Sequence, residues 1–69
     1  MITLDLKGLS CPEPLVKTQM AVKKSNGEDV CVIVDDKHAL ENIQRYAKKQ
    51  KLQVEVTEEV GAWSMRLFA

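Results

Sequence analysis

Residues 30–36 read VCVIVDD, a short apolar run followed by an acidic pair. A short apolar run rich in valine and isoleucine is typical of a strand that is buried on both faces or close to it. Asp35 and Asp36 end the run, and an aspartate at that point can cap the N-terminus of a following helix. We therefore expect an inner strand over residues 30–34 that leads directly into a helix.

The expected helix covers residues 37–50. Its apolar side chains recur at helical spacing, and they fall on one stripe formed by Ala39, Leu40, Ile43, Tyr46 and Ala47. Lysines at positions 48, 49 and 51 follow, where the negative end of the helix dipole favours positive charge. The segment therefore predicts an amphipathic helix that packs on the sheet.

Two further strands are expected after this helix. Residues 52–57 alternate between apolar and polar side chains, which predicts a strand with one polar face. Residues 58–61 then form a short connection, and residues 62–68 form a last strand with apolar side chains on both faces. This difference predicts that the last strand lies nearer the centre of the sheet than residues 52–57.

The N-terminal third of the chain predicts one more strand and one more helix. Residues 2–7 alternate in the same way, and Gly8 ends the run. Residues 15–24 are interpreted as an amphipathic helix with lysines outside, and its apolar positions are Leu15, Val16, Met20 and Val22. Residues 25–27, Ser-Asn-Gly, end this helix.

The predicted element order is β-α-β-α-β-β. Because a connection between parallel strands is right-handed, both helices are expected on the same face of the sheet. The fold class is therefore an α/β (α+β) two-layer sandwich, with a mixed four-stranded sheet and two helices on one face, and residues 1–69 form a single domain. The other, partly exposed face is expected to carry Thr3, Asp5, Ile33, Ser64, Arg66 and Phe68. Ile33 and Phe68 are either a partner contact there or, as is commoner, scattered surface residues.

Composition argues against several classes of protein. Ten basic and ten acidic residues give a net charge of zero, so strong direct binding to nucleic acid is not expected. No apolar run reaches the roughly 20 residues that span a membrane. The N-terminus enters a strand at once, without a signal peptide, so a cytoplasmic location is expected. Cys11, Cys31 and His38 lack the spacing of a zinc site, and neither a metal nor another cofactor is expected.

Cys11 is the candidate reactive residue. It lies in the motif Cys11-Pro12-Glu13-Pro14, between the first strand and the first helix. Unpaired N–H groups and the helix dipole at such a position favour the thiolate, which is the nucleophilic form of cysteine. Pro12 and Pro14 restrict the backbone around it. A reactive, rigidly presented thiol is therefore expected, with a structural thiol as the alternative.

The residues around Cys11 leave alternatives open. His38 begins the second helix at the same edge of the sheet, where it is either a catalytic partner of the thiol or, more commonly, a solvent-exposed helix residue. Glu13 either disfavours the thiolate through its charge or acts as a first-turn acid of the helix. Cys31 lies within a strand among valines and is interpreted as a structural, small apolar residue, with a functional role as the rarer alternative.

The chain resembles the TusA/SirA-like (YedF/YeeD) sulfur-carrier family. The resemblance rests on residues 8–14, Gly-Leu-Ser-Cys-Pro-Glu-Pro, on residues 27–30 and on the acidic pair at 35–36, and it covers essentially the whole chain. It implies the same two-layer sandwich and a persulfide carried on Cys11, with Pro12, Glu13 and Pro14 as supporting residues of the motif. It also implies two kinds of protein partner. One is a cysteine desulfurase or other sulfur donor, and the other is a downstream acceptor in tRNA thiolation, cofactor synthesis or sulfur or selenium metabolism.

Two positions depart from the family pattern. Lys37 stands where relatives often carry a proline, and Gln19 stands where the members that act in tRNA thiolation commonly carry a basic residue. Both fall near the surface where partners are expected to dock, which we assign to Asp35, Asp36 and Gln19. The general carrier role is unaffected by these departures, whereas tRNA thiolation is disfavoured.

Two other classes of function are alternatives. The small fold, the partly apolar open sheet face and the lysines at the helix ends fit a non-catalytic regulatory or RNA-binding interaction module, which would act through Arg66 or Phe68. A thiol redox or selenium-handling protein would use Cys11 together with Cys31. The motif and the resemblance favour the sulfur carrier over both.

Overall fold

The computed structural model of the chain describes residues 2–9, 13–25 and 27–69. Its elements are β1 (Ile2–Asp5), α1 (Glu13–Ser25), β2 (Val30–Val34), α2 (Lys37–Lys49), β3 (Gln53–Glu59) and β4 (Ala62–Phe68). The boundaries of β2 and β4 match the sequence prediction, and those of the other elements shift by one or two residues. Neither helix in these ranges is long and apolar enough to cross a membrane.

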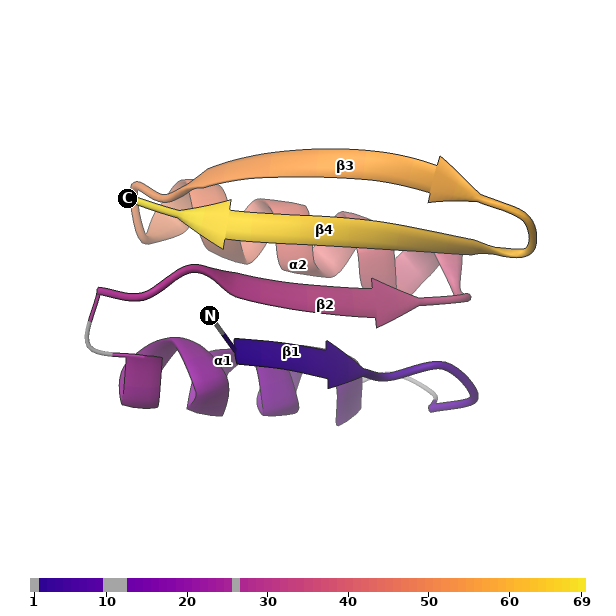
Figure 1. Cartoon of the computed structure of the whole chain (residues 1–69), viewed down its shortest axis with the longest axis horizontal. Helices are drawn as coiled ribbons and strands as arrows, with labels where there is room; N and C mark the ends of the chain where they lie inside the picture. Colours follow the sequence, from indigo (N-terminus) through magenta and orange to yellow (C-terminus); the bar gives the residue numbers. More distant parts are fainter. Residues whose placement is uncertain (1, 10–12, 26) are drawn as a thin grey trace.

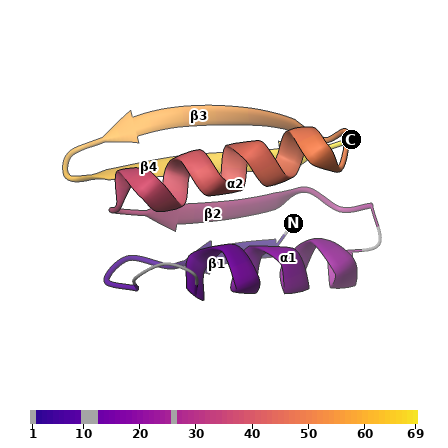
Figure 2. The same cartoon turned by 180° about the vertical axis from the view of Figure 1, so that it is seen from behind.

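The four strands form one mixed sheet in the order β1-β2-β4-β3. β1 is parallel to β2, while β4 is antiparallel to both β2 and β3. Figure 1 shows the sheet in front with both helices behind it, and Figure 2 shows the reverse view. The predicted fold is confirmed: it is a two-layer sandwich in which both right-handed crossovers bring their helix to the same face.

The core lies between the sheet and the two helices. Ile43 of α2 and Met65 of β4 are both fully buried there, at 0% exposure. The buried apolar cluster around them consists of Leu6, Ala21, Val30, Val32, Val34, Ala39, Leu40, Ala47 and Leu67. β4 lies between β2 and β3, so its predicted central position is confirmed. Removal of this apolar surface from water is the main favourable term in folding.

The connection between β3 and β4 is shorter than residues 58–61. Glu58 pairs with Trp63 and Glu59 pairs with Ala62, so both glutamates belong to β3 and the prediction of a four-residue connection is wrong. The turn is made by two residues, and Gly61 adopts a φ of 74°, which glycine reaches without steric cost. Charged residues at the end of an exposed edge strand look like a loop in the sequence, because neither face of that strand end is buried.

α1 buries only part of the apolar stripe that the sequence predicts, since Leu15 and Val22 pack against the core as expected. Val16 and Met20 are 45% and 52% exposed, although they were expected on the apolar stripe. The buried positions of the helix are instead Pro14, Thr18, Ala21 and Ser25. Thr18 Oγ1 donates a hydrogen bond to the carbonyl of Pro14 at 2.8 Å, and Ser25 Oγ donates to the carbonyl of Val22 at 2.7 Å. Because these hydroxyls are satisfied within the helix, small polar residues can face the sheet.

The face of the sheet away from the helices carries the side chains that were expected there, together with Cys31. The strand register aligns Cys31 with Thr3 on one side and with Arg66 on the other. Successive side chains of a strand point to opposite faces, so only every second residue of β2 reaches the helices. Cys31 therefore lies on the open face, where it is partly exposed, although its neighbours Val30 and Val32 are buried in the core.

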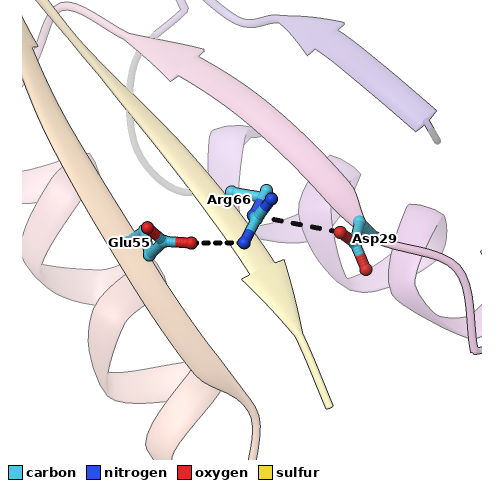
Figure 3. A network of polar contacts seen from close by, with 3 residues as sticks. All are labelled: Asp29, Glu55 and Arg66. Atoms are coloured by element: carbon cyan, nitrogen blue, oxygen red, sulfur yellow. Dashed lines mark hydrogen bonds and ion pairs between the residues drawn. The ribbon is translucent and has the colours of Figure 1, made fainter.

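Arg66 is the centre of a polar network on this open face (Figure 3). Its guanidinium forms an ion pair with Glu55, and its Nε lies 3.8 Å from Oδ2 of Asp29. It also lies over the ring of Phe68, 4.6 Å from the centroid. The Phe68 ring is thus covered by the side chain of Arg66. This contact favours the interpretation of Phe68 as an ordinary surface residue over that of a partner contact.

Candidate functional site

The candidate site lies where the loops after β1 and β2 leave the sheet. Parallel neighbouring strands end at the same edge, so residues 6–9, which follow β1, lie beside the acidic pair that follows β2. The N–H of Leu6 donates to the carbonyl of Ile33 at 2.8 Å, which keeps the two segments paired up to the start of these loops. We use the term loop edge for residues 6–9, 13–14 and 35–38.

The β1–α1 loop begins with a tight turn. β1 ends at Asp5, two residues before the predicted end, because Asp5 Oδ1 accepts a hydrogen bond from the N–H of Lys7 at 3.1 Å and the chain turns there. The N–H of Leu9 then donates to the carbonyl of Leu6 at 3.3 Å. Gly8 has a φ of 83°, a left-handed conformation that disfavours residues with a Cβ. The glycine therefore sets the direction in which the chain approaches the motif.

Asp35 ties this turn to the neighbouring loop. The N–H of Gly8 donates to Oδ1 and Oδ2 of Asp35, at 3.2 and 3.1 Å. A hydrogen bond to a carboxylate is stronger than one between neutral groups. The sequence predicts Asp35 as a docking residue and, together with Asp36, as a possible helix cap, but not this contact. The available signal was an aspartate that follows the strand next to the one that Gly8 ends.

Replacement of Asp35 with alanine is expected to release the Gly8 turn. The loss of one charge-assisted hydrogen bond at an exposed position should lower the free energy of unfolding by about 1 kcal/mol. Amide hydrogen exchange measured by NMR should accelerate more at Gly8 than in β4, where only the roughly fivefold effect of the global destabilisation is expected. Asp35→Asn is the matched control, since its amide oxygen still accepts. Equal exchange rates at Gly8 in Asp35→Ala and in the parent chain would contradict this role.

Asp36 caps α2, as the sequence predicts. It has extended backbone angles, φ −119° and ψ 125°, and its side chain accepts a hydrogen bond from the N–H of His38 at 3.1 Å. Nδ1 of His38 lies 3.8 Å from the same carboxylate, and the imidazole is 84% exposed. This arrangement supports the interpretation of His38 as an exposed helix residue.

Loss of this cap gives a second measurable effect. Asp36→Ala should lower the free energy of unfolding by about 1 kcal/mol, because an N–H at the start of α2 loses its acceptor. Urea denaturation followed by circular dichroism measures the change. Asp36→Asn should retain most of the stability, since asparagine is also a good N-cap. A denaturation midpoint for Asp36→Ala equal to that of the parent chain would show that the cap does not stabilise α2.

α1 begins at the loop edge. Glu13 is the first residue of the helix and is exposed in the first turn, where the dipole favours a carboxylate. This position supports its interpretation as a first-turn acid. Pro14 follows and is buried; it suits the first turn because its missing N–H would have no helical partner there. Both motif residues therefore have a structural role at the N-terminus of α1.

Cys11 and Pro12 lie outside the described residues. Their described neighbours are Leu9, which packs against the core, and Glu13, the first residue of α1. The chain that carries Cys11 therefore leaves the described structure at the loop edge and rejoins it there. Among residues 2–9, 13–25 and 27–69, no three histidine, cysteine or acidic side chains gather closely enough to hold a metal ion.

Gln19 lies away from the acidic pair. It is six residues into α1 from Glu13, which corresponds to about 9 Å along the helix axis. A groove between the two helices is lined by Leu15, Gln19, Asn42, Arg45, Tyr46 and Lys49. The predicted docking residues thus divide between two places, with Asp35 and Asp36 at the loop edge and Gln19 in a groove where α2 supplies two basic side chains.

Comparison with known proteins assigns the family. Residues 2–67 match the sequence profile of the family described as Sulfurtransferase TusA. The chain belongs to the TusA family. This match confirms the resemblance to the TusA/SirA-like family that the sequence indicates.

Similar proteins carry related descriptions. The chain is 43% identical over 60 residues to a candidate sulfur carrier protein of Methanocaldococcus jannaschii, covering 86% of this chain and 80% of that protein. It is 41% identical over 46 residues to a candidate sulfur carrier protein of Halobacterium salinarum, covering 65% of this chain and 57% of that protein. The crystal structure of a SirA-like protein from Desulfitobacterium hafniense has a TM-score of 0.93 and 29% identity, and covers 100% of this chain and 97% of that one. The TusA-family fold is therefore shared along the whole chain.

Proposed function

We propose that the chain, acting as one domain over residues 1–69, carries sulfur as a persulfide on Cys11. The sulfur comes from a cysteine desulfurase or another sulfur-donor protein. It passes to a downstream acceptor in tRNA thiolation, cofactor synthesis or sulfur or selenium metabolism. The observation that carries the proposal is the position of Leu9 and Glu13, which hold both ends of the Cys11 segment at the loop edge, next to the N-terminus of a helix.

The loading step is a transfer of sulfur without net oxidation. The Cys11 thiolate attacks the outer sulfur of the donor's cysteine persulfide. A new S–S bond forms on Cys11 as the donor's S–S bond breaks, and the donor cysteine leaves as a thiolate. The N-terminus of α1 favours the negative charge of both the attacking thiolate and the persulfide product. Delivery repeats the same exchange with the acceptor as the nucleophile.

The described residues at the loop edge support a carrier that relies on its partners for proton transfer. Asp35 accepts from Gly8, and Asp36 caps α2. His38 is largely exposed and lies beside Asp36. Each of these groups thus has a structural contact or faces solvent. A carrier fits this arrangement better than a self-sufficient cysteine–histidine enzyme, because a donor or acceptor enzyme can supply the acid and base.

We further propose that partners dock on the loop edge and on the adjoining groove of Gln19. Asp35 is exposed there, and the groove adds Arg45 and Lys49 beside Gln19. The proposed docking surface therefore carries acidic groups at the loop edge and basic side chains in the groove. Charges arranged in this way select and orient a partner more than they raise its affinity.

The interaction-module alternative is weaker. It depends on Arg66 and Phe68, yet the guanidinium of Arg66 already contacts Glu55, Asp29 and the Phe68 ring. A phosphate group of RNA would have to compete with two carboxylates for this arginine. The open face is thus poorly suited to binding nucleic acid.

Sulfur loading tests the proposal directly. The chain is incubated with a cysteine desulfurase and cysteine, and its intact mass is measured by mass spectrometry. We expect the addition of one sulfur atom, which a thiol reductant then removes. A chain that gains no sulfur from any desulfurase tested, while a known carrier in the same reaction is loaded, would overturn the proposal.

A further inference from the structure

A groove runs along the outer side of β1, on the flank of α1. Its volume is about 270 Å³, and it is lined by Ile2, Leu4, Lys17, Met20, Ala21 and Lys24. The lining is mainly apolar, and the two lysines on its rim are exposed. Met20 is 52% exposed, an unusual state for a methionine next to apolar neighbours. The groove is separate from the loop edge and plays no part in the sulfur chemistry proposed above.

β1 presents unpaired backbone groups to this groove. It is the end strand of the sheet, in the order β1-β2-β4-β3. The N–H groups of Ile2 and Leu6 donate to β2 and its flank, at 3.0 and 2.8 Å. Because these directions alternate along a strand, the N–H and C=O of Thr3 and Asp5 point outward. Such an edge is a template for pairing with another strand.

α1 provides the floor on which an added strand would rest. α1 lies behind β1 in Figure 1 and in front of it in Figure 2, and in both views it extends past β1 on the side away from β2. A strand beside β1 would therefore lie over the flank of α1 that carries Lys17, Met20 and Lys24. The added strand would cover the exposed methionine and remove apolar surface from water.

We propose that this groove binds an extended, acidic segment of a partner protein, which adds to the sheet as a strand beside β1. Lys17 and Lys24 are two helical turns apart, about 10 Å along α1, with Met20 between them. Side chains on one face of a strand recur about every 7 Å. The segment that fits has an apolar residue opposite Met20 and acidic residues two positions before and after it, within reach of the flexible lysines.

The same charges argue against a second copy of this chain as the occupant. Antiparallel pairing of two β1 strands would extend the sheet and bring the two α1 helices together on one face. Lys17 and Lys24 of both copies would then face each other across the seam. Four like charges in one seam oppose association, whereas an acidic segment neutralises them.

A synthetic peptide tests the proposal. The probe is GSETVTESG with blocked ends, in which the two glutamates and the valine share one face of a strand. Titration is followed by amide chemical shifts in NMR spectra of the full chain. We expect saturable shifts at Thr3, Asp5 and Met20 at millimolar peptide, and no such shifts with GSKTVTKSG. Absence of shifts at these three residues with the acidic peptide would overturn the proposal.

Two matched pairs of variants separate the charge contribution from the backbone contribution. Lys17→Glu/Lys24→Glu should weaken binding of the acidic peptide about tenfold and should bind the lysine peptide instead, while Lys48→Glu/Lys49→Glu on α2 should behave like the parent chain. Thr3→Pro removes an outward N–H without affecting the bonds to β2, and should abolish binding that Thr3→Val retains. Unchanged binding in the charge-reversed variant would contradict the proposal, as would a β1-dependent dimer seen by sedimentation. Cys11→Ser should bind the probe normally, so failure of sulfur loading and failure of this inference are distinguishable.

Discussion

Replacement of Cys11 with serine is expected to abolish sulfur loading completely. A serine hydroxyl forms no persulfide, and the thiolate is the only form of this side chain that attacks sulfur. Cys31→Ser should load like the parent chain. Cys31 lies on the open face of β2, four residues before Asp35, which corresponds to about 13 Å along the strand. The second thiol is therefore on another face and away from the loop edge, where donors are expected to dock.

The pair of cysteine variants makes this prediction decisive. Intact mass after reaction with a cysteine desulfurase and cysteine should show one added sulfur atom in the parent chain and in Cys31→Ser, and none in Cys11→Ser. Circular dichroism checks that both variants are folded. Loading of Cys11→Ser at the level of the parent chain would move the carrier site to Cys31. Loss of loading in Cys31→Ser alone would also assign the carrier site to Cys31. If the two cysteines instead form a redox pair, the parent chain should contain a disulfide between them.

β2, α2 and β4 could be predicted from the sequence because the residue pattern that predicts each element lies within that element. β2 is a run of β-branched residues followed by an N-capping aspartate, and α2 has one continuous apolar stripe around Ile43. β4 packs Trp63, Met65 and Leu67 against the core and still holds Phe68 on its other face, which distinguishes it from the more polar β3. In these elements the hydrophobic pattern, the turn residues and the final burial all agree.

α1 could not be predicted as well because its packing depends on its position over the sheet. Helical spacing alone permits a stripe through Val16 and Met20, but the helix instead turns Thr18 and Ser25 inward. Two hydroxyls that bond to their own helix cost little to bury, and small side chains allow close approach. Of the two apolar residues left outside, Met20 lines the surface groove beside β1. Helical spacing alone predicts a core position for it, and only the tertiary structure shows that it lies in this groove.

In the candidate site, too, some features could be predicted from the sequence and one contact could not. The motif itself, and the expectation that the acidic pair provides a cap, were evident from residue types in order along the chain. The contact between Gly8 and Asp35 joins residues 27 positions apart, and no local sequence pattern predicts it. It follows from parallel pairing of β1 and β2, which aligns the ends of both strands. Long-range contacts of this kind become predictable only when the strand order is known.

Replacement of Ile43 with alanine is expected to leave most of the protein unfolded. Ile43 is fully buried at 0% exposure, in the centre of the face that α2 packs on the sheet. Truncation of a buried isoleucine to alanine costs about 2–5 kcal/mol, through lost burial and the cavity left behind. A single core in a chain of this size supplies only about 3–5 kcal/mol of net stability. The loss is thus comparable to the whole stability of the domain.

Urea denaturation followed by circular dichroism measures this effect, with two companion variants. Ile43→Val should fold and lose about 0.5–1.5 kcal/mol, which keeps the position measurable if the alanine variant does not fold at all. Val60→Ala lies in the fully exposed β3–β4 turn and should match the parent chain. A midpoint for Ile43→Ala close to that of Val60→Ala would mean that α2 contributes little to the core. Since the loop edge depends on α2 being docked behind Asp36, sulfur loading should fall in Ile43→Ala in parallel with the folded fraction.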